Sequence, residues 1–416
     1  MPQPSPEEEF LKNEFKQFYL ANEIKSIPQI EQREFGIGAY GKKITKRHMS
    51  FSDYSDLNFF LRNEVPLFIS SSAAYYKDPS ARPMESKLFL GSDLVYEFDV
   101  SDINSDCKEN HDFWLCEKCG KKYAVLLEAC NECQGKLIQY KFPCSKCVNE
   151  TKKQTLRLLN ILRDELGLSS NISVNFSGNA GYHVHIRDKS IRNISAEARL
   201  AIVDYITAEG FSFEKSGFNF DDLKCPPIHE AVGLRKRVLD NLTNFILNAS
   251  YDWLVQYGCV SLTMSQKHAG KNLVAKIIEK RKEVAEQLKR GLFYTIGSNK
   301  VASAFWKALA EKAVSEASLP IDRQTSVDIY KIVRVPDTLH GSTGFIAKTI
   351  ELAKIEDFNP FEHALAFGKR QIKVFISKAP EFKIDGEKFG PFDNEEATLP
   401  ENAAVYLVAK GVAKIM

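Results

Sequence analysis

The sequence lacks several features that would assign the protein to a broad class at once. No run of about 18 apolar residues occurs in the 416-residue chain, so we expect no membrane-spanning helix. The stretch MPQPSPEEEFLKNEF is acidic and polar and lacks the apolar core of a signal peptide, which predicts a location in the cytosol or the nucleus. The formal net charge is only +2, so any surface that binds nucleic acid must be local.

Internal repeats and long low-complexity linkers are also missing, and the composition, 44% hydrophobic and 26% charged, is that of a globular chain. The length is sufficient for two or three domains. Strand patterns dominate both ends and helical periodicity dominates the middle, which predicts an α/β (α+β) core with a helical excursion. We expect a core formed by 1–191, with a zinc-binding module at 104–150, and by 319–416, with a mainly helical insertion at 192–318.

Individual segments carry more specific patterns. REFGIGAYGKKITKRHMSF (33–51) predicts two strands around a glycine-rich turn, and NISVNFSGNAGYHVHIRD predicts two more strands joined by a tight turn. NLVAKIIEKRKEVAEQLKRGL is typical of a helix, and the basic run at 266–290 indicates a solvated face with glutamate partners. Beyond residue 319 we expect a short capped helix and a proline turn in TSVDIYKIVRVPDTLHG, a strand in KRQIKVFISK and a terminal helix in ENAAVYLVAKGVAKI.

The segment LVYEFDV carries two acids in a strand pattern that covers 93–100. Side chains alternate between the two faces of a strand, so Glu97 and Asp99 point the same way. Two neighbouring carboxylates repel each other unless a positive charge lies between them. The pattern therefore indicates either a solvated edge strand or a site for a divalent metal ion.

Cysteine is concentrated in one segment, where three CxxC pairs follow one another. Without a secretion signal, this spacing favours metal binding over disulfides. Four-ligand sites of this kind are closed, so we expect one or two structural Zn²⁺ ions and no catalytic role for them. The candidate ligands are Cys107, His111, Cys116, Cys119, Cys130, Cys133, Cys144 and Cys147.

The spacing allows two partitions of these ligands. Either the first four share one ion and the last four another, or Cys107 and His111 join Cys144 and Cys147 and enclose a ribbon that holds the other four. Cys225 and Cys259 stand outside the cluster, and we expect them to be buried apolar residues.

Two further segments carry groups suited to phosphate. FSGNAGYHVHI offers the Ser177 hydroxyl, backbone amides from Gly178 onwards and His183, although the same pattern is that of a plain hairpin. LPIDRQTSVDIYKIVRVPDTLHGSTG offers Asp322, Arg334 and His340, although a single histidine is more often structural.

In this order, the acidic strand, the zinc motif, the SGxxGxH turn, the helical insertion and the Asp–Arg–His segment resemble the small catalytic subunit of archaeal and eukaryotic-type DNA primases. The resemblance covers the chain from about residue 30 onwards and is closest to archaeal members in SLPIDRQTSVDIYKIVRVPDTLHGSTGF and FNPFEHALAFGKRQIKV. It implies an archaeo-eukaryotic primase core with a modified RRM-like sheet. It also implies nucleotidyl transfer that makes short RNA primers on single-stranded DNA from NTPs, with dNTPs accepted by archaeal members.

The resemblance also implies roles for individual residues. Glu97, Asp99 and Asp322 would hold two catalytic Mg²⁺ or Mn²⁺ ions, with Asp102 and Asp328 as substitute ligands. Glu97 stands where the family has an aspartate, and the turn has Asn179 and Ala180 where eukaryotic members carry basic residues. The nucleotide phosphates would be contacted by Ser177, Gly178, His183, Arg334 and His340.

The partners follow from the same resemblance. It implies a heterodimer with a large regulatory subunit that carries an iron–sulfur cluster, in the cytoplasm of an archaeal cell or the nucleus of a eukaryotic one. Three alternatives are a repair-type primase-polymerase, a non-catalytic zinc-ribbon subunit that binds nucleic acid, and an inactive paralogue, the last suggested by Glu97. We expect template contacts on the zinc-bearing lobe and at Lys42, Lys43, Lys46 and Arg47.

Overall fold

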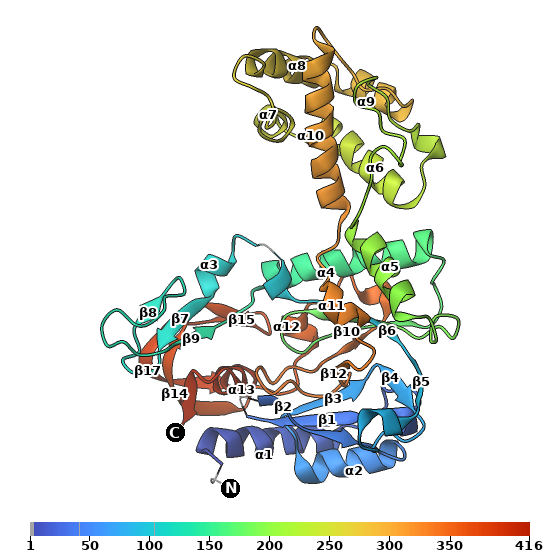
Figure 1. Cartoon of the computed structure of the whole chain (residues 1–416). Coiled ribbons are helices and arrows are strands. Elements are labelled where there is room, and N and C mark those ends of the chain that lie inside the picture. The colour runs from blue at the N-terminus through green and yellow to red at the C-terminus, as the bar shows by residue number, and fades with distance from the viewer. Residues whose placement is uncertain (1–3, 41, 104) are drawn as a thin grey trace. The chain divides into compact units, whose positions relative to one another are not determined.

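The computed structural model describes residues 4–40, 42–103 and 105–416, without the side chains of Lys42, Lys43, Gln324 and Thr325 (Figure 1). No helix in these ranges is long and apolar enough to cross a membrane. Internal contacts divide the chain into two units. Unit 1 comprises Met1–Leu156, Ser169–Ser195 and Gln324–Met416, and unit 2 comprises Arg157–Leu168 and Ala196–Arg323.

Unit 1 contains a four-stranded antiparallel sheet in the order β12-β3-β1-β2. Figure 1 shows two helices, α1 and α2, along one side of this sheet. Each helix starts at a capping side chain: the Ser5 hydroxyl accepts from the Glu8 amide at 3.2 Å, and the Asp53 carboxylate accepts from the Asp56 amide at 2.9 Å. The bounds are α1 (Pro6–Ala21), η1 (Ile30–Gln32), β1 (Phe35–Ala39), β2 (Lys42–Met49), α2 (Tyr54–Glu64), β3 (Phe68–Ser72) and β12 (Ile332–Arg334).

A second four-stranded antiparallel sheet has the order β13-β10-β11-β6. Val95 of β6 packs in a buried cluster with Ala73 and Val333, so the inner faces of the two sheets meet there. The predicted acidic strand and the predicted strand pair around SGNAG are therefore confirmed, and the structure shows that they are neighbours in one sheet. The bounds are β4 (Ala74–Tyr76), η2 (Met84–Lys87), β5 (Phe89–Ser92), β6 (Leu94–Phe98), η3 (Val100–Asp102), β10 (Ile172–Phe176), β11 (Tyr182–Ile186), β13 (Thr349–Ile350) and η6 (Leu352–Lys354).

The cysteine-rich segment folds into a small three-stranded sheet in the order β8-β7-β9, followed by a long helix. The pairing of Cys116 with Leu137 and of Phe113 with Tyr140 makes residues 116–137 a closed ribbon. The bounds are α3 (Lys108–His111), β7 (Phe113–Cys116), β8 (Lys122–Tyr123), β9 (Leu137–Tyr140), α4 (Ser145–Asn160) and the π-helical turn η4 (Ile161–Glu165).

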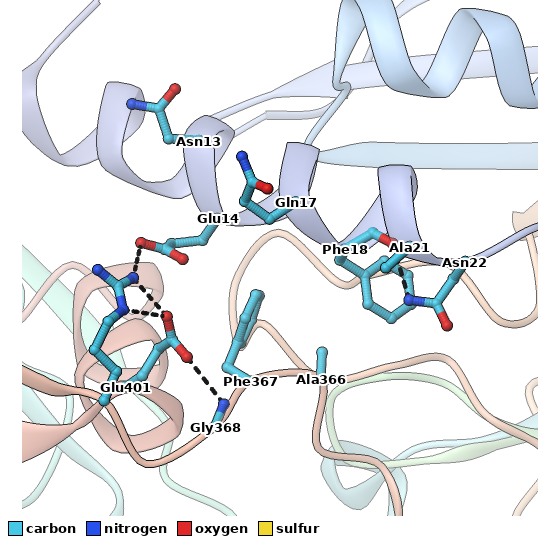
Figure 2. A pocket seen from close by; sticks show the side chains of 11 residues that line it. Asn13, Glu14, Gln17, Phe18, Ala21, Asn22, Ala366, Phe367, Gly368 and Glu401 are labelled. Carbon is cyan, nitrogen blue, oxygen red and sulfur yellow. Dashed lines mark hydrogen bonds and ion pairs between the residues drawn. The ribbon is translucent and has the colours of Figure 1, made fainter.

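The C-terminal part of unit 1 forms a third sheet, β17-β14-β18, and a hairpin, β15-β16. Figure 2 shows a cleft of about 560 Å³ where the first helix meets this part of the chain. In it the Arg370 guanidinium donates to both Glu14 and Glu401 at 2.5 Å, which joins the two ends of the unit. The bounds are α11 (Arg323–Val327, of which Arg323 belongs to unit 2), α12 (Pro360–His363), β14 (Gln371–Ala379), β15 (Phe382–Ile384), β16 (Glu387–Phe389), β17 (Phe392–Pro400), α13 (Glu401–Ala409) and β18 (Ala413–Ile415).

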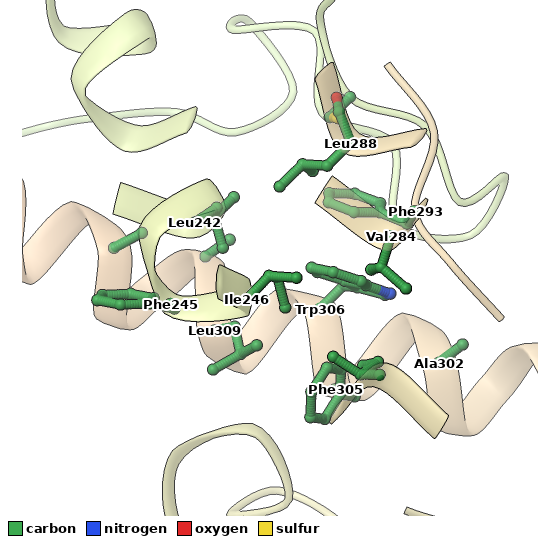
Figure 3. Close-up of a cluster of buried hydrophobic side chains, with 14 of the residues drawn as sticks. Leu242, Phe245, Ile246, Val284, Leu288, Phe293, Ala302, Phe305, Trp306 and Leu309 are labelled. Atoms are coloured by element: carbon green, nitrogen blue, oxygen red, sulfur yellow. The ribbon is translucent and has the colours of Figure 1, made fainter. Parts of the chain in front are cut away.

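Unit 2 is helical and has its own hydrophobic core. Figure 3 shows Trp306 and Phe305 of the longest helix packed among apolar side chains such as Ile246 and Val284. The Trp306 indole donates to the Tyr294 carbonyl at 2.8 Å, so this large ring is buried with its polar atom satisfied. The bounds are α5 (Ala196–Thr207), η5 (Ile228–Glu230), α6 (Gly233–Asn248), α7 (Tyr251–Gly258), α8 (Lys267–Glu279), α9 (Arg281–Lys289) and α10 (Asn299–Ala317).

Three predicted elements differ from the structure. The helix expected over NLVAKIIEKRKEVAEQLKRGL is two helices, α8 and α9, that meet at Lys280, and the terminal helix ends at Ala409 and is followed by β18. Arg334 lies in β12, a strand that the sequence did not indicate. The interpretation of the basic run is confirmed, since its lysines pair with Glu279, Glu283 and Glu286.

Candidate active site and metal centres

The two acids lie where β6 leaves its sheet. Glu97 is in the strand and pairs in register with His183 of β11. Asp99 follows the strand in an extended conformation, and its carboxylate accepts from the Ser101 amide at 2.8 Å and from the Ser101 hydroxyl at 2.7 Å. The alternation predicted from LVYEFDV therefore continues one residue beyond the strand, which keeps both acids on one face.

The Glu97 carboxylate lies between the Lys331 ammonium group and the His183 imidazole. Lys331 Nζ lies 3.2 Å from one carboxylate oxygen and His183 Nε2 lies 3.8 Å from the other. Burial raises the pKa of Glu97, but His183 and Lys331 together outweigh it, so the pKa falls below its ordinary value. Glu97 is thus an ionised carboxylate, and the nearby charge of Asp99 is one of the effects that oppose its ionisation.

Lys331 was not identified from the sequence. It directly precedes β12 in the first sheet, whereas Glu97 is in the second, so the ion pair joins the two sheets. Lys331 comes three residues before Arg334. The sequence would link the two residues only if β12 were recognised as a strand, because both residues then lie at the same edge strand of one sheet.

The SGNAG turn connects β10 to β11 and is fixed by internal hydrogen bonds. The Ser177 hydroxyl accepts from the amides of Asn179 at 3.3 Å and Gly181 at 3.1 Å. Both lone pairs of the hydroxyl are then used, which leaves its proton to donate. Two amides that were expected to cradle phosphate therefore bond to Ser177 instead.

Two glycines of this turn allow close approach to its neighbours. A Cβ on Gly181 would lie 2.1 Å from the Phe98 carbonyl oxygen, so the turn sits directly against the end of β6. Gly178 has a φ of +82°, and a Cβ there would lie 2.7 Å from Cβ of His340. The turn is consequently wedged between the acid-bearing strand and the His340 segment.

Arg334 is a buried cation that forms no ion pair with an acid in the described part of the chain. Its side chain lies over the Phe68 ring, with Cζ 4.8 Å from the ring centre. Nε and Nη1 are buried and have no hydrogen-bond partner among the residues that the structure describes. Burial lowers the pKa of the guanidinium to about 10. A buried guanidinium of this kind calls for an anionic partner.

Two histidines lie beside this cation. His340 packs edge-on against the same Phe68 ring, with ring centres 5.4 Å apart, and its Nδ1 accepts from the Ser342 amide at 3.2 Å. A neutral His340 therefore carries its proton on Nε2. Burial lowers the pKa of His183, whose Nδ1 has no partner within the described part of the chain. Positive charge and hydrogen-bond donors thus gather next to the two acids.

The other candidate acids are placed differently. Asp322 is exposed and lies at the end of unit 2, whereas Glu97 and Asp99 belong to unit 1. Asp328 is exposed and accepts from the Tyr330 amide at 2.8 Å, after α11 rather than at its start. Asp102 is an exposed residue of η3 and is not on the strand face that carries Glu97.

The predicted template contacts near the start of the chain are only partly described. The side chains of Lys42 and Lys43 lie outside the described residues, and Lys46 is exposed. Arg47 donates to the buried Glu34 carboxylate at 3.0 Å, so part of its binding capacity is used within the fold.

The eight zinc-type ligands form two groups of four, in the second of the two predicted partitions. The atoms within each group lie within 4.8 Å of one another, as a single metal ion requires. His111 Nδ1 lies 2.8 Å from an Asp112 oxygen, which directs Nε2 towards the thiols. We call Cys107, His111, Cys144 and Cys147 the inner cluster and Cys116, Cys119, Cys130 and Cys133 the outer cluster.

The inner cluster packs against residues next to the candidate active site. Cys147 packs in a buried group with Val100, which follows Asp99, and with Ala180, which is in the SGNAG turn. The outer cluster packs with Leu137 and Trp114, which belong to the same small sheet. The isolated Cys225 and Cys259 are both 5% exposed, which confirms the prediction that they are buried.

Comparison with known proteins places the chain among one group of relatives. The family model described as DNA primase small subunit matches residues 133–352, more than half of the chain. Proteins named DNA primase small subunit PriS are 27% identical in Methanothrix thermoacetophila and 28% identical in Nitrosopumilus maritimus, in each case over 98% of both chains. The protein of that name from Methanosarcina mazei is 26% identical over 97% of this chain and 96% of its own.

Proposed function

The chain belongs to the family of DNA primase small subunits, nucleotidyltransferases that synthesise RNA primers, and we propose that the acids and cations described above carry out that reaction on single-stranded DNA. The likeness over the whole length to proteins of this one name does not favour a repair-type primase-polymerase or a non-catalytic zinc-ribbon subunit.

The observation that carries the proposal is the arrangement of charges at the end of β6. The carboxylates of Glu97 and Asp99 lie on one face, and the Arg334 guanidinium, which has no ion pair among the described residues, is close enough to lower the pKa of His183, the neighbour of Glu97. A nucleoside triphosphate with its divalent ions would provide a partner for both groups. The metal ions would bind the carboxylates, and the phosphates would bind the guanidinium.

The donor set fits Mg²⁺ or Mn²⁺, since hard cations prefer carboxylate oxygens. The family resemblance assigns two such ions to Glu97, Asp99 and Asp322, and Lys331 would share Glu97 with them. When bound, these ions neutralise charge at the α-phosphate and make the primer 3′-hydroxyl more acidic. In the reaction the primer 3′-oxygen forms a bond to the α-phosphorus, the bond from that phosphorus to the bridging oxygen of pyrophosphate breaks, and the 3′-hydroxyl proton passes to solvent water.

The remaining residues act on the triphosphate. Arg334 balances its negative charge, and the Ser177 hydroxyl donates a hydrogen bond to a phosphate oxygen. Gly178 allows His340 to approach the turn, and a Cβ there would prevent it. His183 and His340 donate to phosphate oxygens or pass a proton to the leaving pyrophosphate. Holding both reactants in this geometry supplies much of the rate enhancement in phosphoryl transfer.

The two cysteine clusters hold structural Zn²⁺ in this proposal, because thiolates and one imidazole in closed sets of four suit zinc. The β13-β10-β11-β6 sheet is the counterpart of the family's RRM-like sheet. We also propose that the protein acts in the cytoplasm of an archaeal cell, paired with a large primase subunit, on NTPs and also on dNTPs. The zinc-bearing lobe and Lys46 would contact the template backbone.

The proposal is tested by primer synthesis on single-stranded DNA with Asp99→Asn and Asp322→Asn. Each change removes one metal-binding oxygen, so we expect synthesis to fall by at least about 100-fold with the melting temperature and zinc content unchanged. Asp240→Asn is the matched control, because Asp240 is exposed and pairs only with Lys236 on α6 among the described contacts. Near wild-type synthesis by either test variant would show that its aspartate is not a metal ligand.

A further inference from the structure

Lys410, near the C-terminal end of the sequence, places its ammonium group beside the SGNAG turn. It follows α13, and its backbone amide donates to the Tyr406 carbonyl at 3.0 Å, so the helix end fixes its position. Its Nζ lies 3.4 Å from the Asn179 side-chain oxygen, 231 residues away in sequence. The ammonium group also lies 5.8 Å from the ring centre of Phe142 and 5.4 Å from that of Tyr406.

The charge of Lys410 is not neutralised by a nearby acid. It forms no ion pair with a carboxylate in the described ranges, in contrast to exposed lysines such as Lys373, which lies 2.7 Å from Glu396. Burial lowers the pKa of Lys410 to about 8, against the opposing fields of Asp112 and Asp99. The oxygen of Asp112 that lies nearest to the inner cluster is already bonded to His111 and to the Phe142 amide.

An uncompensated ammonium group in this environment is unfavourable for stability alone. A merely structural residue at this position would be better served by an apolar side chain, which would pack equally well on Phe142 and Tyr406. A function at the adjacent turn explains why a lysine is there.

The turn itself presents little positive charge. Its residues are Ser177, Gly178, Asn179, Ala180 and Gly181, none of them cationic, and the amides of Asn179 and Gly181 are bonded to the Ser177 hydroxyl. Arg334 lies on the Phe68 and His340 side, and Lys410 lies on the Asn179 side. A ligand over the turn would therefore meet a cation from each direction.

We propose that Lys410 is a nucleotide-binding residue, whose ammonium group contacts the triphosphate at the Asn179 side of the turn while Asn179 holds the side chain in place. The inference rests on the proposed function and adds one residue to its phosphate-binding set. The contact is a charge-assisted hydrogen bond from Nζ to a phosphate oxygen, and no bond is made or broken by Lys410.

The first test compares Lys410→Met, which keeps the stem over the two rings, with Lys410→Arg and with Lys414→Met, an exposed lysine of β18. We expect Lys410→Met to raise KM and Kd for an NTP by about tenfold or more, as loss of a hydrogen bond to a charged group does. In Lys410→Met, kcat should change less than KM, and the melting temperature and zinc content should be retained. Lys410→Arg should restore part of the affinity for the NTP. Lys414→Met should match the wild type in all of these measurements.

The second test needs no variant. Acetic anhydride labels lysine amines of the wild-type chain, and mass spectrometry compares Lys410 with Lys414 in the presence and absence of an NTP. We expect the NTP to slow labelling of Lys410 severalfold and to leave Lys414 unchanged.

The outcomes separate this inference from the function on which it rests. An unchanged KM in a folded Lys410→Met protein, or equal labelling of Lys410 with and without NTP, would overturn the role of Lys410 even if primers are made. If the wild type makes no primers but an NTP still protects Lys410, the nucleotide contact stands and the proposed reaction is wrong.

Discussion

At the level of single residues, the buried Arg334 side chain is expected to lower the stability of the folded protein. Its guanidinium is buried over Phe68 with two nitrogen atoms unbonded in the described structure, and burial lowers its pKa. Lys410 is a partly buried ammonium group with no ion pair among the described residues, and the Nδ1 atom of the buried His183 has no hydrogen-bond partner there. Unfavourable burial of this kind is common at sites whose missing partner is a ligand.

Arg334→Met is predicted to separate stability from function. Methionine keeps the apolar contact with Phe68 and removes the unneutralised charge, so the free energy of unfolding should rise by roughly 1–3 kcal/mol. KM for the NTP should rise by at least about 100-fold, because a charged pair with phosphate is lost. Urea unfolding and steady-state kinetics measure the two effects, with Arg334→Lys as the charge-retaining control. A destabilised variant with an unchanged KM would mean that Arg334 has a structural role.

Sequence reasoning located some of these residues and missed others for a physical reason. Glu97 and Asp99 were predicted as neighbours because alternation along a strand is a local property. That His183 stands opposite Glu97 is a matter of register between strands, and Lys331 reaches Glu97 from another sheet. Lys410 was seen only as part of a helix, since nothing local indicates that its stem crosses to Asn179.

At the level of elements, the SGNAG turn depends on glycine for its distance from β6. A Cβ at Gly181 would lie 2.1 Å from the Phe98 carbonyl oxygen, and this contact is with rigid backbone. The turn and the acid-bearing strand therefore keep a fixed spacing, which in the proposed function sets the distance between the phosphates and the acids that would bind metal.

Gly181→Ala is predicted to disturb this spacing. We expect the free energy of unfolding to fall by about 2 kcal/mol or more, the upper part of the range for overpacking, because backbone must move. Gly368→Ala is the matched control, since the nearest atom to a Cβ there is a Glu401 side-chain oxygen at 3.6 Å. Urea unfolding of both variants provides the comparison, and equal stability of the two would show that the close approach is not rigid.

The two metal clusters are predicted to differ in what they support. Cys147 packs on Val100 and Ala180, whereas Cys130 packs within its own ribbon. Zinc analysis should give two ions in the wild-type chain and one in Cys147→Ser and Cys130→Ser. The Cys147 variant should also lose NTP affinity, and the Cys130 variant should keep it. Loss of NTP affinity to the same extent in both variants would contradict the prediction that the inner cluster supports the candidate active site and the outer cluster does not.

The sequence predicted the elements that have a long alternating or helical pattern. It did not predict the short strands, which form because they pair with another strand. The strands around SGNAG and the strand in KRQIKVFISK have clear alternation, and both are confirmed as β10, β11 and β14. β12 and β18 are each three residues long and exist because they pair with β3 and β14. The pairing of β7 with β9 likewise selects between the two zinc partitions, which spacing alone could not do.

At the level of the whole molecule, the chain combines a strand-rich unit and a helical unit, each with its own core. The net charge of +2 gives no general attraction to nucleic acid, so binding of the template should depend on local basic groups and weaken steeply with salt. The family assignment covers more than half of the chain and includes the SGNAG turn and Arg334, whereas Glu97 and Asp99 precede the matched segment.

The most direct measurement is de novo synthesis and primer extension on poly-pyrimidine single-stranded DNA with Mg²⁺ or Mn²⁺, comparing the wild type with Glu97→Ala. We expect synthesis by the wild type and its loss in Glu97→Ala, with an unchanged melting temperature, because we propose that the carboxylate between Lys331 and His183 is a metal ligand. Synthesis retained at the wild-type rate by Glu97→Ala would contradict the account and would make Asp102 the ligand to test next.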